Sequence, residues 1–380
     1  MTINLLSYKI RHFIYKLIHF ISRLLLIKNK SKYDIVIVKP DALGDFTIFS
    51  PFLQSLLDNE YSNKNVLFIG NEACKDLATV FNFSSNLNFL WLERKKFNRN
   101  LLYRFFKELE LQKIHCDIVK CPIYQEDEFV TEYIIRGISS QKKVTMRLDP
   151  SHFNTSINKH IYTDIILSSE RCFFEIDAHN KFLYEVNKSA LKAAKKPLLK
   201  LEKFKALDLP DLYYVVFIGA TEYKRRWSPH NFIRLSNKLQ KVYKGTPVFC
   251  GATDDVNRLI ESELNHQIKG INLVGKTSMS QLVSIISDAD FLVSNESCAP
   301  HIAYISGCNT SYVISNGNHL GRFCPYPDSI YPGYNLLLPP EIIEMSSGDI
   351  SSNDLYYNGS IININSISVT TVFKKIMEAL

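Results

Sequence analysis

The chain has 380 residues, of which 46% are hydrophobic and 22% charged, an ordinary composition for a soluble globular protein long enough to form two domains. Its eight cysteines form no even framework, and Cys116 and Cys121 lack the spacing of a zinc knuckle, so reduced cytosolic thiols are favoured over a disulfide scaffold. The net charge of +7 comes entirely from residues 1–32, and the neutral remainder argues against a nucleic-acid-binding protein.

Residues 1–32 have the pattern of a basic amphipathic helix. Cations and histidines recur on one face, and apolar side chains fill the opposite one; the two sets are Lys9, His12, Lys16, His19 and Arg23, and Leu6, Ile10, Phe13, Leu17, Ile21 and Leu24. Charges interrupt every window long enough to span a bilayer, and no secretory signal is present. We expect this helix to lie on an anionic membrane surface; the alternative is a helix packed on its own domain or on a partner.

Residues 33–200 alternate strands and helices, which predicts an α/β domain with an open, mostly parallel sheet. A buried strand at 34–39 leads through a turn that contains Gly44 into a helix at about 46–57, so Asp45 stands at the helix start. Its carboxylate is either functional or no more than an N-cap. Further strands are expected at 66–70, 117–121, 144–147 and 161–167, and helices at 101–111 and 179–186.

A second domain, 211–365, follows a Lys- and Pro-rich connection at 192–210. Its first strand, 212–218, ends in a loop with Thr221 and three adjacent cations, Lys224, Arg225 and Arg226, and Ser228 and Pro229 then open a helix. Three cations beside a helix start indicate an anion-binding site. Strands are expected at 248–251 and 271–274, with Asp254 and Asp255 in a loop after the first. Residues 366–380 are expected to form a final helix that packs back on one of the two domains.

The stretch from Asp290 to Gly307 is the strongest candidate for a ligand site. An apolar strand breaks into small polar residues, and a helix begins near Ala299. A helix N-terminus at the carboxyl end of a buried strand suits a phosphate or pyrophosphate. Glu296, Ser297 and His301 would lie there and could hold a ribose, a phosphate and a sugar. The simpler alternative is that Ser297 caps the helix and His301 is a packed core histidine.

Three other patterns do not withstand physical reasoning. Residues 270–277 match the letters of a P-loop, but the expected strand falls between the glycines instead of before them. Asp288-Ala-Asp290 resembles a metal-binding Asp-x-Asp, yet it fits a helix end, and no further acid or histidine cluster indicates a metal. Ser297 or Cys298 with His301 lacks the glycines of a hydrolase nucleophile elbow. By contrast, Ser278-x-x-Gln281 predicts a capping box for a helix that ends near Asp288.

From about residue 33 to 380 the chain resembles the bacterial heptosyltransferases, glycosyltransferase family nine. Five segments in order carry the resemblance: Ala42-Leu43-Gly44-Asp45, Gly219-Ala220-Thr221 with Arg225-Arg226-Trp227-Ser228-Pro229, Gly251-Ala252-Thr253-Asp254, Gly275-Lys276-Thr277-Ser278, and Glu296-Ser297 with His301. It implies a GT-B architecture, in which an acceptor-side domain (33–200) and a nucleotide-sugar domain (211–365), both Rossmann-like and doubly wound, face a cleft. It also implies inverting transfer, without metal or cofactor, from a nucleotide sugar to a lipopolysaccharide-type or lipid-linked oligosaccharide acceptor.

The resemblance also implies residue roles. Asp45, next to Gly44, matches the catalytic base, and Arg225 takes the place of a phosphate-binding lysine beside Thr221 and Lys224. Asp254 matches an acid that contacts the nucleotide. Thr277 and Ser278 match the segment that lines its base or ribose. The cluster around the donor is matched by Glu296, Ser297 and His301.

The chain departs from the family pattern at three positions: Glu296 replaces Asp, Cys298 replaces Gly and Arg225 replaces Lys, so the donor sugar need not be ADP-heptose. We expect a cytoplasmic glycosyltransferase, peripheral on the inner face of the cell membrane, that builds lipopolysaccharide or another surface polysaccharide. A nucleotide-sugar epimerase, or a non-catalytic nucleotide-binding scaffold of the same assembly machinery, would be the alternatives.

Overall fold

The computed structural model describes residues 2–25, 31–124, 128–147, 161–168, 174–187, 208–261, 265–345, 355–356 and 359–380. The chain divides into two compact units. Unit 1 comprises Met1–Lys75, Asn82–Arg171 and Ala178–Leu191, and unit 2 comprises Asp76–Phe81, Cys172–Asp177 and Lys192–Leu380. No helix among these described ranges combines the length and the apolar character that crossing a bilayer requires.

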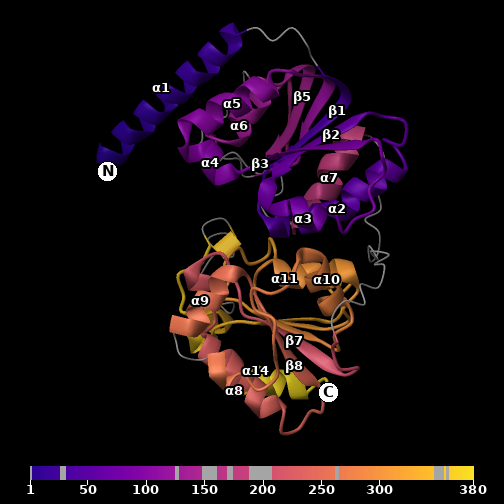
Figure 1. The fold of residues 1–380 in the computed structure, drawn as a ribbon, viewed down its shortest axis with the longest axis vertical. Coiled ribbons are helices and arrows are strands. Elements are labelled where there is room, and N and C mark those ends of the chain that lie inside the picture. Colours follow the sequence, from indigo (N-terminus) through magenta and orange to yellow (C-terminus); the bar gives the residue numbers. More distant parts are fainter. Residues whose placement is uncertain are drawn as a thin grey trace. The chain divides into compact units, whose positions relative to one another are not determined.

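Unit 1 is built on a six-stranded parallel sheet with the order β3-β2-β1-β4-β5-β6. Helices cover both of its faces (Figure 1). The strands are β1 (Ser31–Lys39), β2 (Val66–Asn71), β3 (Leu87–Leu92), β4 (Ile114–Cys121), β5 (Ser139–Arg147) and β6 (Asp164–Leu167). The helices are α1 (Thr2–Leu24), α2 (Leu43–Asp58), α4 (Arg94–Arg99), α5 (Leu101–Leu111), α6 (Thr131–Gly137) and, from Ala178 on, α7 (Glu175–Asn187). All but the first residue of α3 (Lys75–Ala78) is assigned to unit 2.

Unit 2 repeats this topology. Its parallel sheet has the order β12-β11-β10-β7-β8-β9, which, counted from the unit's own first strand, is again the Rossmann order 3-2-1-4-5-6. The strands are β7 (Tyr213–Phe217), β8 (Thr246–Cys250), β9 (Ile271–Asn272), β10 (Leu292–Asn295), β11 (Ser311–Ile314) and β12 (Tyr334–Leu337). The helices are α8 (Pro229–Leu239), α9 (Thr253–Glu261), α10 (Met279–Ser287), α11 (Cys298–Ser306), α12 (Pro340–Met345) and α14 (Val369–Met377). The expected α/β fold of two doubly wound Rossmann-like sheets is confirmed.

Each sheet has its own hydrophobic core, as strands covered on both faces require. In unit 2, Val216 and Val293 from the central strands pack with Trp227 of the loop before α8. Val372 and Ile376 of α14 join this core, so the final helix packs on unit 2. In unit 1, Val36 and Val38 of β1 belong to a cluster that also includes Tyr15 of α1. The N-terminal helix is therefore part of the packed unit.

The structure corrects several expected boundaries. Helix α2 begins at Leu43, so Gly44 and Asp45 lie within its first turn; the N-cap is Ala42, which makes no side-chain cap bond. The interpretation of Asp45 as an N-cap is therefore wrong. Asp254 and Asp255 lie in the first turn of α9 and not in a loop. Ser228 is the N-cap residue of α8, as expected, but its side chain makes no cap bond. Most of the expected connection at 192–210 lies outside the described residues.

Candidate functional site

The most promising site is at the carboxyl edge of the sheet in unit 2, where the strand order reverses. Strands β7 and β10 are neighbours there, and the segments that follow them leave for opposite halves of the sheet. Ligands bind in such a crevice in open α/β sheets. The loop after β7 carries Thr221, Lys224 and Arg225, and the turn after β10 carries Glu296, Ser297 and His301. The topology thus brings two sequence-predicted groups together at one switch point.

Asn295, the last residue of β10, ties the two segments to each other. Its side-chain amide donates to the carbonyl of Ile218 at 2.8 Å, and its carbonyl oxygen accepts from the backbone N–H of Trp227, also at 2.8 Å. All three residues are buried. The loop between Ile218 and Trp227 is therefore fixed at both ends against β10, which holds its cations in a defined position.

Arg225 and Glu296 form a buried ion pair across this switch point. Arg225 Nη2 donates to Glu296 Oε1 at 2.5 Å and to the Glu296 backbone carbonyl at 2.8 Å. The Arg225 side chain is 18% exposed and that of Glu296 only 3%. Two of the three departures from the family pattern are thus direct partners: a longer carboxylate reaches a fork-shaped guanidinium.

The pair is incompletely satisfied. Glu296 Oε2 and Arg225 Nε are both buried, and neither has a hydrogen-bond partner among the residues that the structure describes. Burial raises the pKa of Glu296, and the Arg225 charge opposes that rise. Buried polar atoms are satisfied in the great majority of cases, so an unpartnered acceptor and an unpartnered donor within one ion pair indicate a place for a polar ligand.

The other two cations of the loop have different tasks. Arg226 donates to the carbonyls of Ala220 and Thr221, at 2.6 and 2.8 Å, and so braces its own loop. Lys224 forms a surface ion pair with Glu222 at 3.4 Å, and the Thr221 side chain is exposed. The expected cluster of three cations is therefore divided, and Arg225 is the member that reaches the turn after β10.

Helix α11 begins at this turn. Ser297 is its N-cap residue, and the hydroxyl accepts from the backbone N–H of Ala299 at 3.4 Å, so the capping interpretation holds for Ser297. The neighbouring N–H groups and the positive end of the helix dipole remain suited to an anion. Burial raises the pKa of the Cys298 thiol to about 11, which keeps it protonated and unreactive at neutral pH.

His301 lies one turn into α11 and is buried. Its Nδ1 is 2.9 Å from the hydroxyl of Tyr326, which is also buried and stacks among other tyrosines. Burial, and to a lesser extent the nearby Arg225 charge, lowers the pKa of His301 to about 3. The imidazole is therefore neutral at physiological pH. The core-histidine interpretation describes its burial, while its closeness to Arg225 assigns it to the same site.

The remaining sequence-predicted residues of unit 2 follow β8 and β9. Asp254 is exposed, whereas Asp255 is buried and accepts from the backbone N–H of Ala252 at 2.8 Å. Gly219 and Gly251 pack on Asp255 so closely that a Cβ on either would lie within 3 Å of its carboxylate. Thr277 is half-buried, and Ser278 forms the expected capping box of α10 with Gln281. These loops meet through Gly275, whose N–H donates to the carbonyl of Gly251 at 2.9 Å.

The P-loop-like stretch 270–277 and the Asp288-Ala-Asp290 pattern have the secondary structure that the sequence predicted for them. Strand β9 lies inside the P-loop-like stretch. Asp288 caps the end of α10, and Asp290 accepts from the Tyr243 hydroxyl at 2.7 Å. Within the described parts of the chain, no group of three or more His, Cys, Asp or Glu side chains could hold a metal ion.

In unit 1, Asp45 lies at the equivalent switch point, between β1 and β4. It is partly exposed in the first turn of α2, directly after β1. Lys39, at the end of β1, is buried; its Nζ pairs with Asp41 at 2.9 Å and donates to the carbonyl of Pro122, after β4, at 3.3 Å. The edge beside Asp45 is thus polar and rigidly built.

Sequence analysis did not single out Tyr326 and His319 near these sites, and it named Asp255 without giving it a role. His319 follows β11, has a positive φ of 52°, and donates from Nδ1 to the backbone carbonyl of Tyr356 at 3.0 Å. Burial lowers its pKa, and Arg225 adds to this effect. A signal was available for Asp255, which stands beside Asp254, but Tyr326 is 25 residues from His301 and nothing local marks it.

Residues 154–305 match the model of glycosyltransferase family 9 (heptosyltransferase). No curated protein matches the chain. Among solved structures, a family 9 glycosyl transferase from Veillonella parvula DSM 2008 is similar over 92% of this chain and 98% of its own, with 16% identity and a TM-score of 0.63. E. coli heptosyltransferase WaaC with ADP is similar over 92% of this chain and 99% of its own, with 13% identity and a TM-score of 0.62. E. coli ADP-heptose lps heptosyltransferase II is similar over 91% of this chain and 98% of its own, with 14% identity and a TM-score of 0.55.

At these identities the solved structures establish the fold, which is GT-B, and the family match adds the type of enzyme. Over residues 154–305 the chain thus matches glycosyltransferase family 9, and its fold is that of solved heptosyltransferases, which together support a glycosyltransferase of this type.

Proposed function

We propose that the enzyme transfers heptose or a related sugar from a nucleoside-diphosphate sugar to a lipopolysaccharide or other surface-polysaccharide acceptor, with inversion and without a metal. The observation that carries the donor half of this proposal is the unpartnered Glu296 Oε2 and Arg225 Nε at the switch point of unit 2. Support for the donor class comes from the E. coli heptosyltransferase WaaC, which has been solved with ADP and with ADP-2-deoxy-2-fluoro heptose.

On the donor side, a departing nucleoside diphosphate develops negative charge that fixed positive groups must stabilise. Arg225, the N-terminus of α11 and the Ser297 backbone supply such groups, with Thr221 and Lys224 in the loop alongside. Glu296 Oε2 would accept from a sugar hydroxyl, because an ionised carboxylate oxygen can only accept. Neutral His301 would contact the donor as a hydrogen-bonding group and not as a cation.

The nucleotide itself would bind along the loops after β8 and β9. Asp254 is exposed there and available to a ribose or base, and Thr277 and Ser278 follow in the adjoining loop. Three loops at one sheet edge, joined through Gly275 and Gly251, form a continuous surface for a ligand of nucleotide length.

On the acceptor side, Asp45 would act as the general base that removes a proton from the attacking hydroxyl. Its place supports this role: it is partly exposed at the carboxyl edge of the sheet, next to Gly44, in the first turn of α2. The positive end of the α2 dipole favours an ionised carboxylate at this position.

We expect the substitutions at Arg225 and Glu296, relative to the family pattern, to determine together which donor sugar is bound. Because these two side chains contact each other, neither can change the pocket alone. We therefore expect a donor screen with ADP-, GDP-, UDP- and CDP-sugars to show one nucleotide class that raises the melting temperature. An epimerase would convert the donor without any acceptor, and a non-catalytic scaffold would bind it without releasing nucleoside diphosphate.

For localisation, we propose a cytoplasmic enzyme, peripheral on the inner face of the cell membrane and held there by its basic N-terminal helix, where a lipid-linked acceptor is accessible. The four basic residues of α1 and the lack of any acidic residue in this helix support an anionic surface as its partner.

The decisive experiment replaces Asp45 with asparagine. Release of nucleoside diphosphate in the presence of a truncated lipopolysaccharide acceptor should fall by about 10²- to 10⁴-fold, the usual contribution of a general base. Binding of the nucleotide sugar should be retained. The matched control is Asp58→Asn, an exposed acid at the far end of the same helix, which should leave the rate unchanged. Normal turnover by Asp45→Asn would remove Asp45 from the mechanism.

A further inference from the structure

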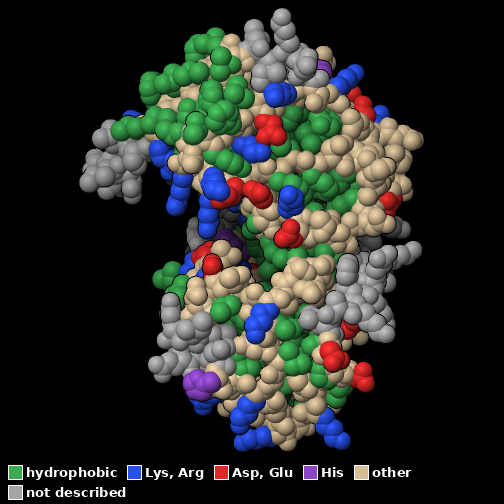
Figure 2. Space-filling model, viewed as in Figure 1, with side chains coloured by type: hydrophobic (Ala, Val, Ile, Leu, Met, Phe, Trp, Pro, Cys, Tyr) green, Lys and Arg blue, Asp and Glu red, His purple; other side chains and the backbone are tan. Residues whose placement is uncertain are grey.

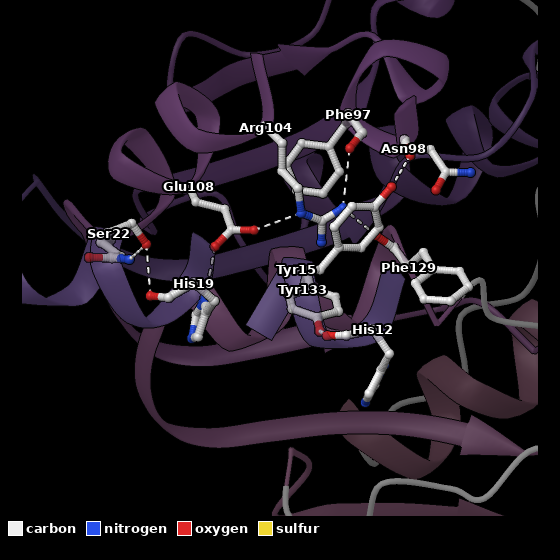
Figure 3. Close-up of polar contacts among 11 residues, drawn as sticks. His12, Tyr15, His19, Ser22, Phe97, Asn98, Arg104, Glu108, Phe129 and Tyr133 are labelled. Carbon is white, nitrogen blue, oxygen red and sulfur yellow. Dashed lines mark hydrogen bonds and ion pairs between the residues drawn. The ribbon is translucent and has the colours of Figure 1, made fainter. Parts of the chain in front are cut away.

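Helix α1 is attached to unit 1 through its polar and aromatic side. Tyr15 is buried, and its ring lies under the guanidinium of Arg104, with 3.8 Å from Cζ to the ring centroid. His19 Nδ1 is 3.0 Å from Glu108 Oε2, and Arg104 Nε donates to Glu108 Oε1 at 2.9 Å. Figure 3 shows this network between α1 and α5. The helix is therefore clamped and is no free tail.

This packing leaves the apolar side of α1 uncovered. Six large apolar side chains, each 42% to 67% exposed, recur at helical steps along it: Ile10, Phe13, Leu17, Phe20, Ile21 and Leu24. The five members of the expected apolar face whose side chains the structure describes are thus exposed, whereas His12 and His19 of the expected basic face are on the packed side. Amphipathic helices of globular domains usually bury the apolar stripe, so this exposure calls for a partner.

Helix α5 continues the uncovered surface. Leu101, Leu102 and Phe106 are 46%, 67% and 59% exposed, although Arg104 and Glu108 of the same helix are fully buried. Figure 2 shows apolar side chains gathered over the region that α1 and α5 occupy in Figure 1. Because this clamp holds α1 against α5, the exposed apolar side chains of both helices belong to one packed unit.

The charges around this surface select an anionic partner. Lys9, Lys16 and Arg23 are exposed on α1, one step around the helix from the apolar stripe, and α1 has no acidic residue. The neighbouring α4 adds four more basic residues and no acid of its own, although Glu93 at its N-cap pairs with Lys96. A symmetric contact with a second copy would bring like charges together, which is costly, whereas anionic lipid headgroups complement them.

We infer that α1 and α5 together form a composite docking surface, with which the folded unit 1 binds an anionic lipid bilayer in one fixed orientation. This inference rests on the proposed membrane location and deepens it, since a single flexible anchor helix would not involve α5. Phe and Leu side chains enter the headgroup boundary while Lys and Arg contact phosphates, the arrangement typical of interfacial helices.

The test measures binding of the full-length protein to vesicles of phosphatidylglycerol and phosphatidylethanolamine, with phosphatidylcholine vesicles for comparison. We expect wild-type protein to bind the anionic vesicles at least tenfold more strongly than the neutral ones. The α5 double variant Leu102→Asp/Phe106→Asp should lose at least tenfold of this binding, as should Phe13→Asp on α1. All three side chains are exposed, so the fold should tolerate the changes.

The matched control is Ile343→Asp/Ile361→Asp, two exposed apolar residues of unit 2 at 61% and 93%, which should bind like wild type. Unchanged binding by the α5 variant would overturn the composite surface, and equal binding to neutral vesicles would overturn the charge argument. Concentration-dependent self-association in sedimentation, without vesicle binding, would assign the surface to a second copy. The vesicle assay contains neither donor nor acceptor, so the Asp45→Asn variant should bind vesicles like wild type. A failure of the membrane inference can therefore be told apart from a failure of the proposed reaction.

Discussion

Each unit contains a buried arginine–glutamate pair, and the two pairs differ in how much of their hydrogen-bonding capacity the protein uses. In unit 1, both carboxylate oxygens of Glu108 have partners, Arg104 and His19. In unit 2, Glu296 uses only Oε1, for Arg225, and its Oε2 is buried without a partner among the described residues. The carboxylate of the first pair is fully used, although Arg104 Nη2 is also buried without a partner among the described residues, whereas the second pair leaves both a carboxylate oxygen and a guanidinium nitrogen unused.

The two arginines differ in how far the protein encloses them. Arg104 donates to the carbonyls of Phe97 and Phe129, at 3.1 and 2.9 Å, and lies over the rings of Tyr15 and Tyr133. The Arg225 side chain is 18% exposed, against 0% for Arg104, and each guanidinium has one unpartnered nitrogen among the described residues, Nε in Arg225 and Nη2 in Arg104. A pair whose carboxylate is fully used supports structure, while one that leaves a carboxylate oxygen and a guanidinium nitrogen unpartnered supports binding. The comparison therefore predicts opposite consequences for equivalent substitutions.

Arg104→Ala should produce the largest loss of stability. It would leave Glu108 as an uncompensated buried charge, which typically costs about 3–5 kcal/mol in the free energy of unfolding. Urea denaturation followed by circular dichroism would measure it. The double variant Arg104→Met/Glu108→Leu, which removes both charges and keeps apolar volume, should be far less destabilised. If the two variants were equally unstable, aromatic packing and not charge compensation would dominate the clamp.

Arg225→Ala should instead affect ligand affinity most. Loss of a partly buried, charge-assisted contact to a diphosphate should weaken nucleotide binding by about 2–4 kcal/mol, a factor of about 30 to 1,000. Isothermal titration with the nucleoside diphosphate found in the donor screen would measure it. Lys241→Ala, an exposed cation at the end of α8, is the matched control and should bind normally. Unaltered affinity in Arg225→Ala would make this pair structural, like the one in unit 1.

Much of the fold and part of this contrast could be predicted from the sequence. Period-two and period-3.6 patterns located most strands and helices, and the Ser278–Gln281 capping box is confirmed because both of its bonds are local. Placing candidate residues after the central strands was also possible, because topology alone brings strand ends to one edge. Side-chain partners were not predictable in this way: Arg225 and Glu296 are 71 residues apart, and no local rule chose Arg225 over its neighbours.

Helix α1 illustrates a different limit. Its amphipathic pattern was predicted correctly, but periodicity does not tell which face meets the protein. The buried face here is the one with Tyr15 and His19, because Arg104 and Glu108 of α5 offer charge and hydrogen bonds that an apolar stripe could not satisfy. That choice depends on a partner helix about 90 residues later in the chain, and sequence analysis of either helix alone could not reveal it.

His301 offers a pH test of the incomplete site. Its folded-state pKa is lowered to about 3, so between this value and about 6.5 the unfolded chain binds a proton that the folded protein does not. Unfolding free energy should therefore fall as the pH drops through this range, by up to about 1.4 kcal/mol per pH unit from this residue. The difference between wild type and His301→Gln, measured by urea denaturation at several pH values, isolates the effect. Parallel pH profiles would show that His301 is not held neutral by burial.

Tyr326→Phe should change stability least, and it tests whether His301 serves the ligand site or only the core of unit 2. The Tyr326 hydroxyl is buried, and its contact with His301 Nδ1 at 2.9 Å makes it the residue that fixes the orientation of the imidazole. Removing one such hydrogen bond should cost about 1 kcal/mol of stability. If His301 serves the donor, the Michaelis constant for the donor should also rise by a few-fold, whereas the acceptor constant should not change. A loss of stability with unaltered donor kinetics would mean that the Tyr326 contact serves the core of unit 2 alone, and the incomplete Arg225–Glu296 pair would then bind its ligand without help from the imidazole.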